Sequence, residues 1–311
     1  MVIQKPNALF IKDKKELIEL KKEIVSIEYI DAIDNEVDGV TIVFAQMYDP
    51  PLFGDQIDVS IGFGDELNYI GQWYVSGNAE YPKEGIFEVR LTSVSFSKSL
   101  KERRTMVYKN ITLNNLLLTI ANRHGLKLKN DDTTSKYIIK SQTNESDLAF
   151  MKRIAEETNA IFAIKNDTII FRFKATGDDD QNIPVIKLDL TQVDNLRIER
   201  VDKTIYQSGI AVWHDSRINR ACSVCIGKGE PVLRLEGSYK TDAEALQKLH
   251  AALARENAGT VRGHFETTED IIAGIGLELD LGGRLEKDLQ ITEVKHEINS
   301  HGYIKTVHFT K

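Results

Sequence analysis

The alternation of apolar and polar residues has a period of two over the first third of the chain. From residue 37 to residue 97, runs such as "QIDVSIGFG" and "GIFEVRLTSVSFS" alternate and are separated by Gly, Pro and Asp. This pattern is typical of short antiparallel strands in a sandwich or barrel. We predict such a β unit here, preceded by a strand at "EIVSIEYIDA" and, before it, by a stretch of helix-forming composition that ends at Lys22.

The period becomes helical after residue 101. Thr112 is a suitable N-cap, Gly125 a suitable stop, and one helix face between them carries Leu113, Leu116, Leu117, Ile120 and Ala121, with His124 near the end. A second helix is predicted with Asn144 or Ser146 as its cap and with Asp147 in its first turn, where the helix dipole favours an anion. Its buried stripe is predicted to be Leu148, Met151, Ile154 and Ala155.

The run "AIFAIKNDTIIFRF" follows the second helix and places Asn166 and Asp167 between two apolar segments. This is the signal of a tight β-hairpin. Residues 101 to 175 therefore predict a small α+β domain. The segment "KATGDDDQNIP" after it is typical of a charged, turn-rich linker.

The last third of the chain again reads mainly as strands, at "NLRIERVD", "SGIAVWHD" and "RACSVCIG". One helix interrupts them, because Thr241 and Glu244 form a capping box ahead of Leu246, Leu249 and Leu253. The final segment, from "GIGLELDLGG" to "YIKTVHF", repeats the order of strands and Gly-containing turns found between "LFGDQIDVS" and "EVRLTSV". We interpret this as a weak internal repeat and predict two similar β domains.

Composition narrows the class of protein. A chain of 311 residues with 41% hydrophobic and 28% charged residues is expected to form two or three domains. No run of eighteen apolar residues and no secretory signal occurs, so we expect the chain to stay in the cytoplasm where it is made. A formal charge of −7 argues against a general nucleic-acid binder, which needs a basic surface.

Two cysteines, Cys222 and Cys225, form a CxxC motif, but none of the seven histidines lies near it at the spacing of a zinc finger. The β-branched, Gly-bounded surroundings "ACSVCIGKGEP" predict a strand and not the helix start of a redox motif. The segment "KHEINSH" resembles a zincin helix, yet His296 and His301 are five residues apart and flank a predicted hairpin turn at Gly302. We expect reduced, structural cysteines and no metal at these histidines.

The remaining chemical candidates are weaker. The acidic pairs and runs at Asp131, Asp132 and Asp178 to Asp180 lack the spacing of an EF-hand and predict solvated loops. "GFGDE" and "GIGLE" do not continue as nucleotide-binding loops, and no G-x-S-x-G elbow occurs. Asp147 is explained as a helix-start anion and not as a general acid. We therefore predict no catalytic, cofactor-binding or metal-binding residues, no cofactor, and a protein that is not an enzyme.

Three segments in this order resemble the late control protein D family of contractile-tailed bacteriophages. They are "SLKERRTMVYKNITLNNLLLTIANRHGLKL", "SQTNESDLAFMKRIAEETNAIFAIKNDTIIF" and the C-terminal "GLELDLGGRLEKDLQITEVKHEINSHGYIKTVHF". The resemblance extends from "EVDGVTIVF" to the end of the chain. The shared stretch is matched by Gln142, Asn144, Ser146, Asp147, Arg153, Ala155 and Glu157, where Glu156 could take the place of Glu157.

This resemblance implies an α+β, mainly β fold with two tube-protein-like antiparallel β-barrels, at residues 1–100 and 176–311, and a small α+β domain at residues 101–175 between them. It implies a virion protein, assembled in the bacterial cytoplasm, that acts as the baseplate hub of a phage or prophage-derived tail. The expected partners are two further copies of the chain in a homotrimer, a separate central spike protein, the tail tube protein and other baseplate proteins. No specific nucleic-acid binding and no membrane insertion are expected.

Two alternative functions remain open on the sequence. One is the hub or adaptor of a related contractile injection system that carries an effector. The other is a tail-associated peptidoglycan hydrolase, which would need a pair of carboxylates in a cleft.

Overall fold

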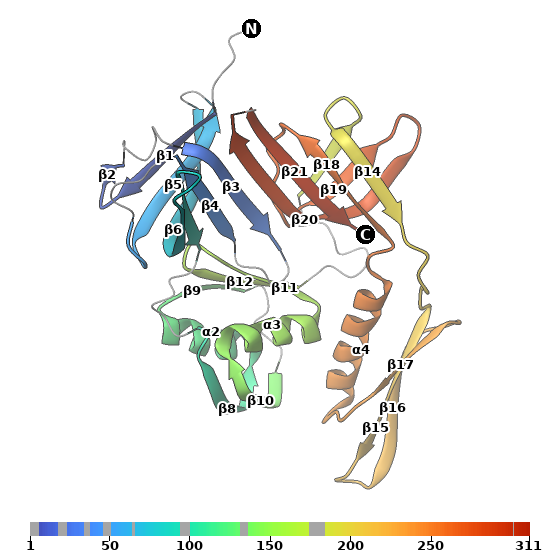
Figure 1. Cartoon of the computed structure of the whole chain (residues 1–311). Coiled ribbons are helices and arrows are strands. Elements are labelled where there is room, and N and C mark those ends of the chain that lie inside the picture. Colours follow the sequence, from blue (N-terminus) through green and yellow to red (C-terminus); the bar gives the residue numbers. More distant parts are fainter. Residues whose placement is uncertain are drawn as a thin grey trace.

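The computed structural model describes residues 6–17, 24–33, 38–45, 51–63, 66–93, 100–130, 136–173, 184–300 and 302–311. Strands dominate, and three helices occur in the described residues. Figure 1 shows two curved β-sheet units side by side at the top, a small α+β domain beneath the first, and a separate lobe beneath the second. The prediction of a mainly β, α+β chain is confirmed. Of the sequence candidates, Asp131, Asp132, Asp178 to Asp180 and His301 lie outside the described residues.

The first sheet unit consists of six main strands in the spatial order β3-β4-β7-β6-β5-β1. Their bounds are β1 Pro6–Lys12, β3 Ile24–Ala32, β4 Gly39–Phe44, β5 Gln56–Phe63, β6 Glu66–Tyr81 and β7 Ile86–Thr92, and the short β2 Lys15–Glu16 pairs with the end of β1. The strand predicted at residues 23–32 is therefore confirmed as β3. Alternate side chains point to one face, where Phe10, Ile42, Val59, Trp73 and Val89 meet in one core.

The second sheet unit has the same strand order, β14-β18-β21-β20-β19-β13. Its strands are β13 Val185–Asp189, β14 Asp194–Arg200, β18 Val261–Thr267, β19 Gly276–Asp280, β20 Leu285–Asn299 and β21 Gly302–Thr310. Phe265, Leu277, Ile291, Val307 and Phe309 form its core. The two edges differ in one respect, because β1 is antiparallel to β5 whereas β13 is parallel to β19.

The internal repeat predicted from the sequence is confirmed by the register of these strands. Tyr74 pairs with Thr92 in the first unit as Gln290 pairs with Thr310 in the second. Two residues further on, the two long strands each contain a β-bulge, at Ser76 and at Thr292. Both bulge hydroxyls donate to a carbonyl oxygen of the neighbouring strand, over 3.0 Å to Arg90 and 3.2 Å to His308.

The prediction of two closed β-barrels is not met within the described part of the chain. Neither unit joins its own two edges; instead β3, the edge strand of the first unit, pairs with the second half of β20. One sheet of 13 strands therefore runs through both units. The physical reason is that an edge strand needs a hydrogen-bonding partner, and the second unit supplies it.

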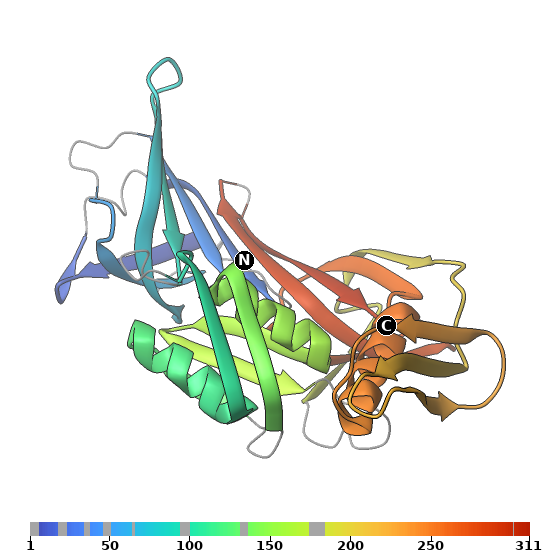
Figure 2. The ribbon, with the colours of Figure 1, turned by 90° about the horizontal axis from the view of Figure 1, so that it is seen from below.

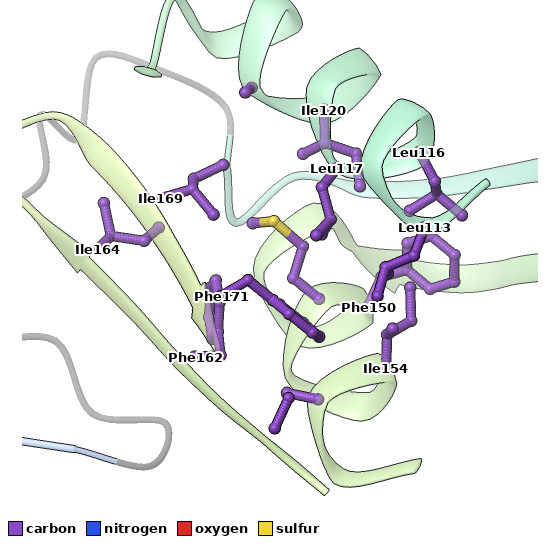
Figure 3. Close-up of a cluster of buried hydrophobic side chains, with 14 of the residues drawn as sticks. Leu113, Leu116, Leu117, Ile120, Phe150, Ile154, Phe162, Ile164, Ile169 and Phe171 are labelled. Carbon is purple, nitrogen blue, oxygen red and sulfur yellow. The ribbon is translucent and has the colours of Figure 1, made fainter. Parts of the chain in front are cut away.

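The small domain, between β7 and β13, has its own core (Figure 3). Strands β8 Arg103–Thr112 and β10 Lys136–Ser146 form a ribbon, β9 Lys127–Asn130, β11 Ala160–Lys165 and β12 Thr168–Phe173 form a three-stranded sheet, and α2 Leu113–His124 and α3 Asp147–Thr158 pack between them. The helix predictions hold, because Thr112 and Ser146 are the N-caps and Gly125 ends α2 at φ 64°. The predicted buried face of α3 was partly wrong, since Phe150 is fully buried and Leu148 is only half-buried.

A further lobe is inserted between β14 and β18. It contains β15 Ser208–Asp215, β16 Arg220–Gly227, β17 Val232–Glu236 and α4 Asp242–Asn257, with a core around Trp213, Tyr239 and Leu249. The predicted N-cap is confirmed, because Thr241 Oγ1 accepts from the Glu244 N–H at 3.1 Å. The sequence predicted β15, β16 and α4, but neither β17 nor the separate core that these elements form. Figures 1 and 2 place the lobe beside the small domain, and α4 contacts α3.

Candidate functional site

The two cysteines of the CxxC motif lie on opposite faces of strand β16. Cys222 is half-buried against the core of the inserted lobe, Cys225 is exposed, and both are free thiols. Residues three apart on a strand point to opposite sides, so the two sulfur atoms cannot share a metal ion or form a disulfide without rebuilding the strand. The predicted structural role agrees with this geometry. Across the described residues, no group of three or more His, Cys, Asp or Glu side chains is placed to hold a metal.

His296 lies in β20, in the predicted hairpin that Asn299 and Gly302 close. Its ring stacks on Tyr29 of β3 with centroids 4.9 Å apart, and its Nδ1 is 2.6 Å from the Tyr303 hydroxyl. Burial, assisted by the charge of Lys305, lowers the pKa of His296 to about 4. The histidine is therefore neutral at pH 7, and its place is at the contact between the two sheet units.

Asp147 is the first residue of α3 and is fully buried. It accepts hydrogen bonds from Arg123 at 2.7 and 2.9 Å and from Gln142 at 2.8 Å, and His124 Nε2 lies 2.7 Å away. Burial raises its pKa, but the hydrogen bonds from His124, Gln142 and Arg123 outweigh burial and hold the pKa below its usual range. Asp147 thus ties the end of α2 and the ribbon to the start of α3, as a structural anion.

The other residues that carry the family resemblance surround this carboxylate. Arg153 binds Glu145 at 2.9 Å and Glu157 at 2.9 Å, so Glu157 is the glutamate that pairs with it. Ser146 caps α3, and Asn144 adopts φ 50°, with its N–H donating to Thr105. The shared stretch therefore specifies the turn from β10 into α3. A shallow, polar pocket beside this turn is lined by Lys101, Arg103, Ser141, Thr143, Asn144, Glu145, Ser146, Ala149 and Arg153.

The contact between the two sheet units combines strand pairing with buried side chains. Six successive residues of β20, from Glu293 to Ile298, pair with Ala32 back to Ile27 of β3. Lys295 bridges to Glu28 at 2.8 Å on the half-exposed face. On the buried face Ile298 enters the core of the first unit. We call this set of contacts the unit junction.

A buried charge cluster attaches the small domain to the unit junction. Lys165 of β11 forms an ion pair with Asp31 of β3 and lies 3.4 Å from Asp38, and Asp31 also accepts from the Ala273 N–H at 2.9 Å. Burial raises the pKa of Asp38 to about 6 although Lys165 opposes this shift. Burial lowers the pKa of Lys165, but the attraction of Asp31 and Asp38 outweighs it. Sequence reasoning missed this cluster, because its members are far apart in the chain and follow no motif.

A second contact holds the small domain to β6. The Asn166 side chain accepts from the Gln72 N–H at 3.2 Å, at a bulge where Gly71 adopts φ 126°, and Tyr74 donates to Asp167 at 2.8 Å. A Cβ atom at Gly71 would lie 2.5 Å from the Asn166 oxygen, so the close approach requires glycine there. The predicted turn residues Asn166 and Asp167 therefore also position the domain.

Two free edges of the described strands occupy the positions that correspond to the paired edges of the unit junction. The second half of β6, from Gly77 to Tyr81, pairs with β7 on one side only, and β14 pairs only with β18. The β6–β7 hairpin extends beyond the rest of its sheet (Figure 2). Free edges of this length offer hydrogen bonds to another strand.

Comparison with known proteins agrees with the resemblance to the late control protein D family. No family model matches the chain. A curated relative, the probable baseplate hub protein of Escherichia phage 186, is 26% identical over 168 residues, which are 52% of this chain and 43% of the relative. The match thus spans less than half of that relative's length. It supports the recognition of the late control protein D family, whose expected role is that of a baseplate hub.

The fold is shared with solved phage tail proteins. A tail protein from Neisseria meningitidis MC58 covers 99% of this chain with a TM-score of 0.72 at 11% identity, matched over 97% of its own length. The 43 kDa tail protein of prophage MuSo2 from Shewanella oneidensis covers 98% with a TM-score of 0.71 at 8% identity, over 98% of its length. A type VI secretion component of E. coli covers 92% of this chain with a TM-score of 0.58 at 15% identity, matched over 73% of its own length. These relatives are described as tail, hub or secretion components and not as enzymes.

Proposed function

We propose that this protein is the structural hub of a contractile phage or prophage tail, and that three copies form a ring between the central spike and the tail tube. The observation that carries the proposal is the edge-to-edge pairing of two sheet units with the same strand order in one chain. Three chains then present six near-equivalent units to a sixfold tube. The sequence relative named as a probable baseplate hub and the shared tail-protein fold support it.

The exposed face of the continuous sheet is suited to line a channel. Along β3, β4, β6 and β7 and along their counterparts in the second unit, the residues that alternate with the cores are mostly polar. Six carboxylates lie there against four cations, leaving two net negative charges per chain; they are Glu28, Glu88, Glu199, Glu266, Glu293, Glu297, Arg90, Arg197, Arg262 and Lys295. A polar wall of negative net charge repels a passing polyanion such as DNA.

The structure favours a hub over a hydrolase of the tail. Asp31 and Asp38 form a close pair of carboxylates, but each is only 4% exposed and both face Lys165. A glycosidase needs two carboxylates flanking a sugar in an open cleft. In the described residues this pair therefore acts within the fold and not on a substrate.

The division into residues 1–100, 101–175 and 176–311 remains a prediction under this proposal, with the inserted lobe as an attachment of the third domain. The partners remain further copies of the chain, a spike protein, the tube protein and other baseplate proteins, in the virion tail. No helix of the described chain combines the length and apolar character needed to span a bilayer.

The test is the mass and symmetry of the purified protein, alone and mixed with the spike protein of the same tail. Light scattering should give three chains per particle, and negative-stain averages viewed end on should show threefold symmetry with a central opening. A chain that stays monomeric in both samples, or rings without threefold symmetry, would contradict the ring.

A further inference from the structure

The unit junction has a counterpart that a single chain leaves incomplete. Within the chain, β3 of the first unit pairs with the second half of β20 of the second unit. By strand order, β14 is the counterpart of β3 and β6 is the counterpart of β20. In the described residues, β14 and the second half of β6 are the two segments whose corresponding edges are free.

The register of the missing pairing follows from the pairings that exist. Gly77 pairs with Arg90 after the bulge in β6, as Glu293 pairs with His308 after the bulge in β20, so Gly77 corresponds to Glu293. Thr41 of β4 pairs with Arg90 as His264 of β18 pairs with His308, so Thr41 and His264 correspond. Glu28 pairs with Thr41 and Arg197 pairs with His264, so Glu28 and Arg197 also correspond. Because Glu293 faces Ala32 in the unit junction, Gly77 should face Val201, and Ala79 should face Glu199.

We propose that β14 of one chain pairs antiparallel with Gly77–Tyr81 of β6 of a second copy, in this register, and so repeats the unit junction between chains. The inference rests on the proposed ring and names the surface and the residues that close it. Each chain gives one edge and accepts the other, so the contact is heterologous. Three such contacts alternate with three unit junctions, and the ring closes when all six contacts have the same geometry.

The side chains at the two edges are complementary. In the unit junction, the His296 and Asp31 positions are diagonal neighbours on the buried face, and the charge of Asp31 acts on His296. Their counterparts are Glu80 and Arg200, an acid and a base. At the end of the free edge, Tyr81 is 45% exposed, which is high for an aromatic residue and falls when a neighbouring strand covers it.

The edge of β14 is also free to accept a strand. Val201 donates its N–H to Thr260, toward β18. Since the N–H groups of successive residues in a strand point to alternate sides, the N–H groups of Ile198 and Arg200 point to the open edge. Arg200 is exposed and forms a surface ion pair with Glu286, which a partner's Glu80 can join or replace.

Cysteine cross-linking tests the register. In the full chain carrying Cys222→Ser and Cys225→Ser, the facing pair Ala79→Cys with Glu199→Cys should form disulfides between chains under mild oxidation. Directly opposed strand residues lie within the Cα separation of about 4.4 to 6.8 Å that a disulfide needs. The matched control is Ala79→Cys with Arg197→Cys, two residues out of register, where the separation is about 7 to 8 Å. We expect about tenfold more covalent trimer from the facing pair.

A second control is the unit junction itself. Lys295→Cys with Ile30→Cys, the pair at the same position within one chain, should give a disulfide inside the monomer and no increase in mass. Charge reversal adds an independent readout. Glu80→Arg and Arg200→Glu should each weaken assembly by about tenfold, and the double reversal should restore it.

The outcomes separate the proposed function from the proposed surface. Covalent products that stop at three chains support both. A trimer by light scattering without the 79–199 cross-link, or with a stronger 79–197 cross-link, overturns the register and leaves the ring. Cross-linked products that continue beyond three chains overturn closure. A chain that neither assembles nor cross-links, either alone or mixed with the spike protein, contradicts both.

Discussion

The two sheet units share their strand order and the register of their longest hairpin, but they differ in what is attached to them. The first unit carries the small domain on the Lys165 cluster and the Asn166 turn, whereas the second carries an inserted lobe between β14 and β18. In the second unit the edge of β20 is covered by β3, whereas the same edge of β6 is open. In the proposed ring of three chains, the shared sheet unit would occur six times and each attachment three times.

The buried faces of the two units also differ at the junction. The counterparts of the carboxylates at Asp31 and Asp38 are Arg200 and Val261, so only the first unit can form the charge cluster with Lys165. The cluster therefore serves to attach the small domain and is not part of the repeated sheet. Removing the cluster should weaken this attachment and leave the second sheet unit unchanged.

The largest effect is expected for Lys165→Met. The substitution keeps the length of the side chain but leaves Asp31 and Asp38 buried without a cation, at 6% and 5% side-chain exposure. Removing one partner of a buried ion pair costs about 3 to 5 kcal/mol. Chemical denaturation should show this loss, and Asp31→Asn with Asp38→Asn in the Lys165→Met background should recover part of it. An equal loss from Lys187→Met, an exposed lysine of the second unit, would argue against the cluster.

A somewhat smaller effect is expected inside the small domain. Leu117 is fully buried between α2 and the three-stranded sheet (Figure 3), so Leu117→Ala should cost about 2 to 5 kcal/mol through lost burial and a residual cavity. Leu118 on the same helix is 41% exposed, and Leu118→Ala is the matched control with a cost within about 0.5 kcal/mol. Hydrogen exchange should rise in residues 100–173 and stay unchanged in the second unit. Increased exchange throughout both units would show that the small domain is part of the repeated core.

The sequence predicted the locally specified parts of this architecture. Thr112, Ser146 and Thr241 cap the helices because capping depends on residues a few positions apart. The tight turn at Asn166 and Asp167 was found for the same reason, since both residues adopt positive φ. The internal repeat was visible in the sequence as a repeated order of strands and Gly-containing turns.

The parts that depend on distant residues could not be predicted. The prediction that each unit closes into its own barrel was wrong. The edge strand β3 pairs with β20 of the second unit and not with a strand of its own unit, and no residues near β3 in the sequence signal this choice. The Lys165–Asp31 pair joins residues 134 positions apart. The absence of a metal at the "KHEINSH" segment stays a prediction, whereas the place of His296 in the unit junction depends on Tyr29 and Tyr303, which its local sequence does not reveal. Phe150 was missed because it lies beside the expected stripe.

A pH effect of intermediate size should distinguish the covered edge from the open one. The pKa of His296 in the fold is about 4, below its ordinary value of 6.5, because its charged form is buried. Stability from this group is present above pH 6.5 and is lost as the pH falls toward 4. Asp38, with a raised pKa, has the opposite sign: its contribution is present below its ordinary value and is lost as the pH rises through about 6.

The His296 effect is isolated by comparison with a neutral variant. His296→Gln cannot be protonated, so the difference in unfolding free energy between the native chain and His296→Gln should narrow as the pH falls from 6.5 to 4, while Asp38 acts on both proteins alike. Glu80→Gln at the counterpart position on the open edge is the matched control, because this side chain is exposed in the isolated chain and its replacement should leave the dependence of the unfolding free energy on pH unchanged. A parallel pH dependence of the native chain and His296→Gln would refute the assignment.

The smallest effect tests whether the two units are equivalent residue by residue. Ser76 and Thr292 occupy the same bulge, and each hydroxyl donates to a carbonyl of the next strand, at 3.0 and 3.2 Å. Ser76→Ala and Thr292→Ala should each cost about 0.5 to 1.5 kcal/mol, because each leaves one carbonyl without that donor. Thr292→Ser keeps the hydroxyl and should cost less than Thr292→Ala. Similar losses of unfolding free energy at the two bulges would show that the bulge hydroxyl stabilises both hairpins in the same way. A loss at only one bulge would mean that the two hairpins share their register but not the contribution of this hydrogen bond to stability.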